Sequence, residues 1–198
     1  TLAAAALLAM RWNGGVPMLD PMCGAGTIPI EAALLARRIA PGQARAFACE
    51  RWPLAPVAAF DALRAVAKEG VVPRAPMPIL ASDRDAGAIT AARANAERAG
   101  VADDIAFRQC ALSSVDPPRE RGLLLTNPPY GARVGDRNAL RSLYAQIGNV
   151  ARGSCEGWTL AILSADRLLD AQVKLPLRQV LRFSNGGIPV RLMAARLP

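Results

Sequence analysis

The sequence predicts an α/β fold in which a mostly parallel sheet is covered by helices on both faces. Short apolar segments typical of strands alternate with longer helical segments, which favours parallel strands joined by crossover helices. The chain has 198 residues, 52% of them hydrophobic, enough for one domain with a sizeable core. An Asn-Gly pair in "SNGG" indicates a C-terminal hairpin, which adds an antiparallel strand to the sheet. We therefore expect residues 1–198 to form a single domain.

The first part of the chain places a glycine-rich loop between a strand and a helix. Prolines and glycines mark the loops between the predicted elements. The elements expected from 1 to 78 are a helix over 2–12, a strand over Val16–Asp20, a helix over 27–39, an irregular stretch over 40–56, a helix over 56–68 and a loop over 71–78.

The second part continues the alternation and ends in the hairpin. Gly100 is expected to close the helix before it. The elements are strands over 79–83, 104–110, 122–127 and 158–165, helices over 86–99, 138–151 and 166–171, and hairpin strands over 178–183 and 188–197 around the turn 184–187.

Cysteine and histidine usage limits the possible chemistry. The four cysteines are widely spaced, without a CxxC pair, and the chain has no histidine. A zinc site or a disulfide framework is not expected, and catalysis by an imidazole is excluded. We expect no metal, and reduced thiols in a cytoplasmic protein.

The remaining composition concerns membranes and partners. No stretch of 18 apolar residues lacks a charge, so we expect no membrane span. The opening "TLAAAALLAMRW" lacks the features of a signal peptide and looks like a helix from a longer protein. The net charge of +8 suits a polyanionic partner such as nucleic acid, although codon bias toward arginine could produce part of it.

The segment "LDPMCGAGT" follows the first strand and allows three interpretations. It could be a plain strand-to-helix turn. A dinucleotide loop needs a small residue at 29, where Pro29 stands, and a Walker A loop needs a lysine that is absent. An S-adenosylmethionine loop of the pattern Asp-x-x-x-Gly-x-Gly is matched by Asp20, Gly24 and Gly26. Gly24 and Gly26 would let the backbone approach a ligand closely, and Asp20 could accept hydrogen bonds from it.

The second strand ends in "ASDRD", with Asp83 at its tip. A carboxylate there can accept hydrogen bonds from both ribose hydroxyls of an adenosyl ligand. Asp83 could instead cap the following helix, but Asp85 is an equally good cap. If one of these two acids caps the helix, the other remains available to bind a ligand.

The fourth strand ends in "TNPPYG", which alone would be a strand-ending turn. Together with the glycine loop it carries a resemblance. The stretches "LDPMCGAGTIPIEAALLARRIAPG", "ASDRDAGAITAARANAERAG" and "LLTNPPYGARVGD" resemble, in order, the catalytic domain of the THUMP-associated RNA guanine-N2 methyltransferases, the group that contains the bacterial 23S ribosomal RNA enzyme. The segments "GWTLAILSAD" and "FSNGGIPVRLMAARL" match more loosely.

The resemblance implies a class I, Rossmann-like methyltransferase fold, S-adenosylmethionine as cofactor, S-adenosylhomocysteine as product, and RNA, such as large-subunit rRNA, as substrate. The family's THUMP RNA-binding domain is absent from these residues. The residues assigned to the cofactor are Asp20, Cys23, Gly24, Gly26, Thr27, Asp83, Arg84, Ala111 and Asn127, and those assigned to catalysis are Asn127, Pro128, Pro129 and Tyr130.

One position departs from the family. Ala111 stands about where the family usually has an acid that meets the adenine amine. Ser113, Ser114 or the backbone could supply that contact, or the cofactor could bind more weakly.

The chemistry of the acceptor explains the Asn-Pro-Pro-Tyr sequence. The N2 amine of guanine is conjugated with its ring and needs acceptors for its two hydrogens, so that the nitrogen lone pair faces the methyl group. The side-chain carbonyl of Asn127 and the backbone carbonyl of Pro128 could accept them, and the two prolines stiffen this backbone. Tyr130 offers a face for stacking, and Gly131 lets the chain turn away.

Three alternatives remain. Adenine-N6 DNA methyltransferases share "NPPY", because adenine N6 is also a conjugated amine. A non-catalytic cofactor- or RNA-binding module would explain Ala111, and a nicotinamide enzyme is disfavoured by Pro29.

Some side chains near the motifs also allow two interpretations. The arginines that follow the motif could hold phosphates or simply form a solvated helix face: Arg133, Arg137 and Arg141. Trp52 could be core packing. The oligomeric state and the modified guanosine stay open.

Overall fold

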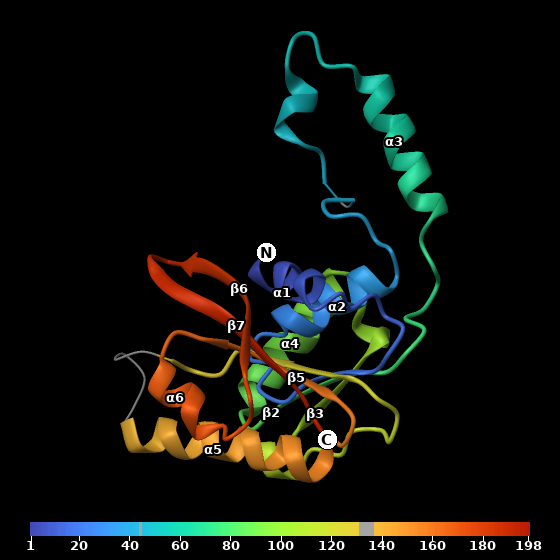
Figure 1. Ribbon diagram of the computed structural model, residues 1–198. Coiled ribbons are helices and arrows are strands. Elements are labelled where there is room, and N and C mark those ends of the chain that lie inside the picture. The colour runs from blue at the N-terminus through green and yellow to red at the C-terminus, as the bar shows by residue number, and fades with distance from the viewer. Residues whose placement is uncertain (44, 131–136) are drawn as a thin grey trace.

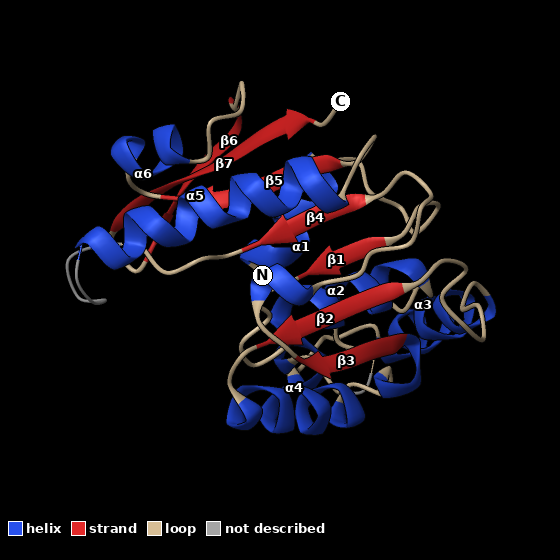
Figure 2. Cartoon of the chain, turned by 90° about the horizontal axis from the view of Figure 1, so that it is seen from below, coloured by secondary structure: helices blue, strands red, loops and turns tan. Residues whose placement is uncertain are grey.

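The computed structural model describes residues 1–43, 45–130 and 137–198. The described strands form one seven-stranded sheet in the order β3-β2-β1-β4-β5-β7-β6, with β3 and β6 at its two edges (Figure 2). The strands are β1 (Met18–Asp20), β2 (Ile79–Asp83), β3 (Ile105–Gln109), β4 (Leu123–Thr126), β5 (Thr159–Ser164), β6 (Arg178–Asn185) and β7 (Ile188–Arg196).

The prediction of a mostly parallel sheet with an antiparallel hairpin strand is confirmed. Strands β1 to β5 pair in parallel, whereas β7 pairs antiparallel with both β5 and β6. Strand β6 therefore runs in the same direction as β1 to β5, and its carboxyl end lies at the same edge of the sheet as theirs. The strand predicted over 79–83 has these bounds, and the other parallel strands are shorter than predicted.

Helices cover both faces of the sheet (Figures 1 and 2). Helices α1, α2 and α4 pack with the sheet in one apolar cluster, and α5 and α6 pack in a second cluster on the other face. The described α-helices are α1 (Leu2–Ala9), α2 (Thr27–Ala36), α3 (Val57–Glu69), α4 (Ala86–Arg98), α5 (Arg137–Ser154) and α6 (Arg167–Gln172). None of these helices is both long and apolar enough to cross a membrane.

Strand β4 shows why the central strands are apolar throughout. Its alternating side chains enter both cores, since Leu123 and Leu125 belong to the cluster with α1, α2 and α4, while Leu124 belongs to the cluster with α5 and α6. All four residues of β4 are buried. A parallel strand covered on both faces needs such a continuous apolar run.

The hairpin turn differs slightly from the prediction. Strand β6 continues through Asn185, which pairs with Ile188, so only Gly186 and Gly187 form the turn. Their φ values are 56° and 84°, the positive pair that a type I′ turn requires. Glycine bears this conformation without strain, whereas Asn185 keeps an ordinary strand backbone.

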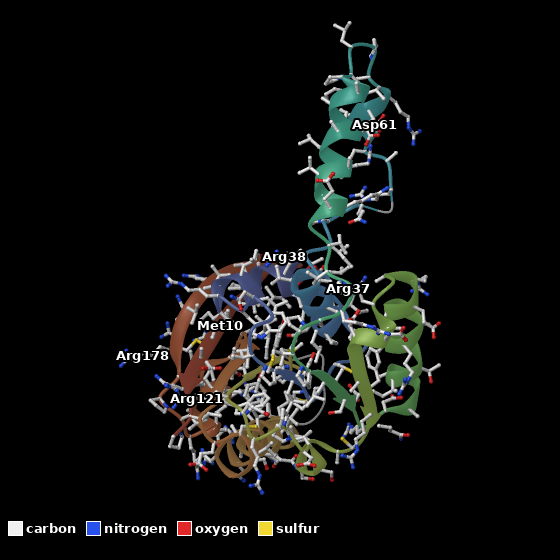
Figure 3. All side chains as sticks on the ribbon, turned by 90° about the vertical axis from the view of Figure 1, so that its right-hand side faces the viewer. Met10, Arg37, Arg38, Asp61, Arg121 and Arg178 are labelled. Atoms are coloured by element: carbon white, nitrogen blue, oxygen red, sulfur yellow. The ribbon has the colours of Figure 1, made fainter. Side chains whose placement is uncertain are left out.

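Residues 45–72 form an arm that extends away from the sheet and carries α3 (Figures 1 and 3). No residue of α3 is buried. Trp52 is 68% exposed and Leu54 is 95% exposed, so the interpretation of Trp52 as core packing is wrong. Arg64 of α3 pairs with Glu50, which links the two halves of the arm.

Candidate active site

The two motifs meet at the centre of the sheet. From β1 the chain adds β2 and β3 on one side, and it then crosses to add β4 and β5 on the other. The loops after β1 and β4 therefore diverge at the switch point of the strand order, where open α/β sheets bind ligands.

The glycine loop owes its shape to two left-handed residues. Gly24 and Gly26 have φ values of 52° and 85°, which favour glycine. A side chain on Gly26 would crowd Ala92 of α4, at 3.0 Å from its Cβ, whereas a side chain on Gly24 would point into open space. Gly26 thus serves packing, while Gly24 leaves its surroundings open for a ligand. Thr27 begins α2 and is exposed.

Asp83 joins the glycine loop to the end of β2. The Gly24 amide donates to its Oδ2 at 3.0 Å, and the Asp85 amide donates to its Oδ1 at 3.0 Å. Asp85 caps α4 by accepting from the amides of Gly87 and Ala88, so of the two candidate caps, Asp83 and Asp85, it is Asp85 that takes this role. Asp83 is therefore fixed by two backbone donors and remains available to a ligand.

Asp20 lies beneath the loop rather than at its surface. It is 1% exposed and accepts hydrogen bonds from the Thr126 hydroxyl at 2.8 Å and from the Met22 amide at 3.2 Å. Burial raises the pKa of Asp20 to about 7, against the opposing effect of these two donors. The expected direct contact with a ligand stays a prediction, and this placement favours an indirect role.

Cys23 is buried in the same loop. Burial, with the nearby carboxylates of Asp20 and Asp83, raises the pKa of the Cys23 thiol to about 12. Its amide donates to Ser82 O at 2.9 Å, which ties the loop to β2. A thiol in this state is not a nucleophile near neutral pH, so Cys23 shapes the loop.

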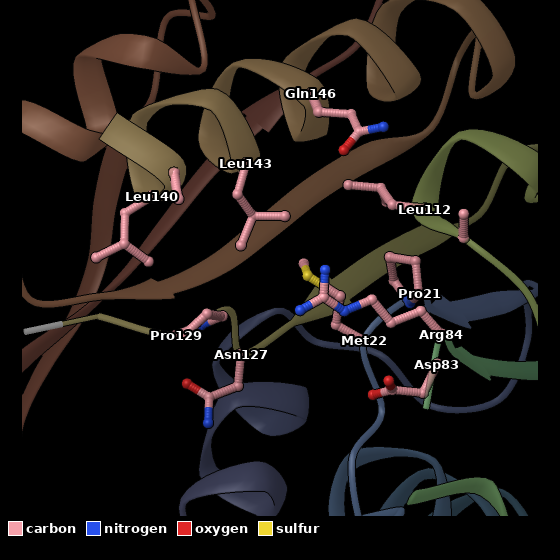
Figure 4. Close-up of a pocket in the computed structure, with 12 residues that line it drawn as sticks. Pro21, Met22, Asp83, Arg84, Leu112, Asn127, Pro129, Leu140, Leu143 and Gln146 are labelled. Carbon is pink, nitrogen blue, oxygen red and sulfur yellow. The ribbon is translucent and has the colours of Figure 1, made fainter. Parts of the chain in front are cut away.

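A cavity of about 440 Å³ opens between the ends of β1, β2 and β4 and helix α5 (Figure 4). Five residues predicted for the site line it: Asp83, Arg84, Ala111, Asn127 and Pro129. Seven others predicted for the site do not line it: Asp20, Cys23, Gly24, Gly26, Thr27, Pro128 and Tyr130. Its volume lies in the range typical of small-molecule sites, about 300–1,000 Å³.

Helix α5 supplies a wall that the sequence motifs did not indicate. Figure 4 shows Leu140, Leu143 and Gln146 facing Asn127, Asp83 and Arg84 across the cavity. The missed lining residues are Pro21, Met22, Leu112, Ala139, Leu140, Leu143 and Gln146. The apolar stripe of α5 is visible in the sequence, but it also fits ordinary core packing.

Arg84 and Ala111 occupy the side of the cavity next to β2 and β3. The Arg84 guanidinium extends into the cavity in Figure 4 and has no hydrogen-bond partner among the described residues. Ala111 is exposed there, and its neighbour Leu112 is buried. Ser113 and Ser114 are exposed but do not line the cavity, so neither stands in for the missing acid in this arrangement.

The Asn-Pro-Pro-Tyr segment lies where β4 ends. Asn127 is exposed and Pro128 is buried. Tyr130 is half-buried, packs against the cluster with α1, α2 and α4, and accepts a hydrogen bond from Asn185 Nδ2 at 3.3 Å. Asn127 thus lines the cavity, whereas Tyr130, three residues further along the chain, does not.

Some predicted contacts fall elsewhere. Arg137 and Arg141 are exposed on α5, and Gly131 and Arg133 lie outside the described residues. Within residues 1–43, 45–130 and 137–198, no group of three or more acidic or cysteine side chains could hold a metal ion. The expectation of a reaction without a metal stays a prediction.

Comparisons with known proteins agree with this geometry. A family model described as "RMKL-like, methyltransferase domain" matches residues 1–191. The Ribosomal RNA large subunit methyltransferase K/L of Shewanella sp. (strain W3-18-1) is 37% identical over 192 residues, covering 94% of this chain and 27% of that protein. The curated relatives are longer, and the chain spans between about a quarter and a half of their length.

Solved structures share the fold across the whole chain. The crystal structure of SMU.472 complexed with SAH has a TM-score of 0.91 at 32% identity, covering 100% of this chain and 52% of that one. A structure from Listeria monocytogenes, described as a predicted N6-adenine-specific DNA methylase, has a TM-score of 0.86 at 34% identity, covering 100% and 50%. With the family model matching nearly all residues, the chain belongs to the RMKL-like methyltransferase domain family.

Proposed function

We propose that residues 1–198 are the catalytic domain of an RNA methyltransferase that acts on the exocyclic N2 amine of a guanosine, in 23S rRNA. The observation that carries the proposal is the position of Asn127, which lines the same cavity as Asp83. Asn127, which can accept a hydrogen bond from a conjugated amine, and Asp83, which can accept from ribose hydroxyls, thus line one cavity. The K/L name of the Shewanella relative supports the choice of large-subunit rRNA.

The cavity suits S-adenosylmethionine. Asp83 is fixed by the amides of Gly24 and Asp85, which leaves carboxylate lone pairs free to accept from ribose hydroxyls. The apolar side chains of Leu112, Leu140 and Leu143 form walls for a purine. The space above Gly24 is open to a ligand. The binding of SAH by SMU.472 supports the same class of cofactor for this chain.

The protein's contribution to the reaction is positioning. When bound, S-adenosylmethionine supplies an electrophilic methyl group, whose bond to sulfur breaks as its bond to N2 forms, leaving S-adenosylhomocysteine, and the amine then loses a proton to solvent. The Asn127 carbonyl accepts one amine hydrogen and the Pro128 carbonyl the other, which directs the nitrogen lone pair at the methyl group. Pro128 is buried and its ring restricts the backbone, which favours acceptors that are already arranged before the base arrives.

Nucleoside mass spectrometry on cells that lack the gene tests this function. We expect one N2-methylguanosine to disappear from large-subunit rRNA and to return with the wild-type gene but not with the Asn127→Ala form. Unchanged rRNA would contradict the proposal.

An adenine-N6 DNA methyltransferase is the second candidate, favoured by the description of the Listeria protein. Loss of N6-methyladenine from genomic DNA in the same experiment would establish it. A non-catalytic module is tested by cofactor titration, because no detectable binding of S-adenosylmethionine by the intact full-length protein would favour it.

A further inference from the structure

The tip of the β6–β7 hairpin extends past the end of the parallel sheet. Ser164, the last residue of β5, pairs with Arg191 of β7, which in turn pairs with Arg182 of β6. Three more pairs follow toward the turn, ending with Asn185 and Ile188. At about 3.4 Å per residue, the hairpin extends about 10 Å beyond β5. Because β6 runs with β1 to β5, this tip stands at the edge where the sheet carries Asn127.

Asn185 at this tip contacts the catalytic segment. Its Nδ2 donates to the Tyr130 hydroxyl at 3.3 Å, although the two residues are 55 positions apart. Phe183, on the same face of β6, packs against the apolar cluster that also receives Tyr130. The hairpin and Tyr130 are therefore joined by a hydrogen bond and pack against the same apolar cluster.

The hairpin itself does not need an asparagine at 185. The positive φ values of the turn belong to Gly186 and Gly187, and Asn185 lies in the last strand pair. Among the described residues, its side chain forms one hydrogen bond, to Tyr130, and none to the turn backbone. The amide thus acts on Tyr130 rather than on the turn.

We propose that the hairpin tip forms the outer wall of the acceptor side of the site, and that Asn185 is a positioning residue that holds the Tyr130 ring for stacking with an unpaired guanine. This inference rests on the proposed function. In this arrangement Asp83, Asn127 and α5 line the cofactor side, while Tyr130 and the hairpin face the base. Tyr130 is half-buried, so part of the residue remains accessible. A ring held at its hydroxyl loses less freedom when a base stacks on it.

Kinetics of Asn185→Ala, Tyr130→Phe and the double variant test the proposal. Both single changes remove the same hydrogen bond, so each is expected to lower kcat/KM for RNA about three- to tenfold. The double variant should be no worse than the poorer single variant, because the second change has nothing left to remove. Affinity for S-adenosylmethionine and the melting temperature should not change.

Ser184→Ala is the matched control. Ser184 is the exposed neighbour of Asn185, points to the opposite face of β6, and has no side-chain hydrogen bond among the described residues. It should retain wild-type kcat/KM. Effects of Asn185→Ala and Tyr130→Phe that multiply, or full activity of Asn185→Ala, would overturn the inference alone. A wild-type chain that methylates no RNA would overturn the proposed function, and the inference with it.

Discussion

The Thr126 hydroxyl donates a hydrogen bond to the Asp20 carboxylate, with 2.8 Å between Oγ1 and Oδ1, in a part of the core that solvent does not reach. Thr126 immediately precedes Asn127, and Asp20 immediately precedes the glycine loop. The bond therefore ties the residue before Asn127, at the end of β4, to the residue before the glycine loop, at the end of β1. Burying a carboxylate is costly unless it is hydrogen-bonded, and here the Thr126 hydroxyl and the Met22 amide provide those bonds.

The buried acid makes stability depend on pH. The pKa of Asp20 rises from its ordinary 3.8 to about 7 through burial and, less strongly, the charge of Asp83, while Thr126 and Met22 oppose the rise. An acid whose pKa is raised by folding stabilises the fold when protonated. That stability is fully present below about pH 4 and is lost as pH rises through 7.

Asp20→Asn should remove this dependence, because an asparagine carbonyl can still accept from Thr126 and Met22 without carrying a charge. The difference between the ordinary pKa of 3.8 and the folded-state pKa of about 7 corresponds to about 4 kcal/mol in the free energy of unfolding, at about 1.4 kcal/mol for each pH unit. Urea unfolding from pH 4 to 8 should show the variant gaining stability over wild type as pH rises. Parallel curves for the two proteins would mean that Asp20 ionises as it does in the unfolded chain.

Asp83→Ala should weaken cofactor binding. Two hydrogen bonds from ribose hydroxyls to a carboxylate, each about 1.5 kcal/mol or more, correspond to at least about 100-fold in Kd. Calorimetric titration with S-adenosylmethionine measures this, and Asp116→Ala, which removes an exposed acid that does not line the cavity, should bind as wild type does. Equal loss in both variants would assign the effect to net charge rather than to contact with the ribose.

Asn127→Ala should abolish transfer while leaving the cofactor site intact. Loss of a pre-positioned polar group that acts in the transition state lowers kcat by about 10²–10³. Single-turnover methylation gives the rate, and titration gives the Kd for S-adenosylmethionine, which should stay within about threefold of wild type. Retained turnover would show that another group accepts the amine hydrogens.

Two of the three tryptophans, Trp52 and Trp158, test the contrast between the arm and the core. Trp158 is 1% exposed and packs with the α5 and α6 cluster, so Trp158→Ala should cost about 3–5 kcal/mol. Trp52 is 68% exposed, so Trp52→Ala should change the free energy of unfolding by less than about 0.5 kcal/mol. Chemical denaturation of both variants measures these changes. A large loss of unfolding free energy in Trp52→Ala would mean that the arm packs against another surface.

The sequence was sufficient for the sheet and the motif positions because those depend on local signals. Alternating apolar runs and Pro-Gly punctuation located the strands, and strand ends in a parallel sheet necessarily meet at one edge. The orientation of Asp20 was not predictable, since β1 has three residues and all are buried, which leaves no alternation to distinguish core from ligand. The position of Leu143 in the cavity wall and the hydrogen bond of Asn185 to Tyr130 each bring together segments that are far apart in the sequence. Local sequence patterns cannot predict such contacts.

Ala111→Asp should strengthen cofactor binding, because Ala111 is exposed, lines the cavity and stands where related enzymes are expected to carry an acid. A carboxylate there could accept from the adenine amine, a charged hydrogen bond of about 1.5 kcal/mol or more, so the Kd for S-adenosylmethionine should fall about tenfold. Ala111→Asn introduces an uncharged side chain of similar size and controls for shape alone, so its affinity for S-adenosylmethionine should increase less. The Kd for adenosine, which lacks the sulfonium, should be measured as well. Because adenosine is uncharged, a change in its Kd reports contact with the base and not attraction to the positive charge of the methyl donor. A gain for S-adenosylmethionine without a gain for adenosine would place the new carboxylate near the sulfonium and away from the adenine.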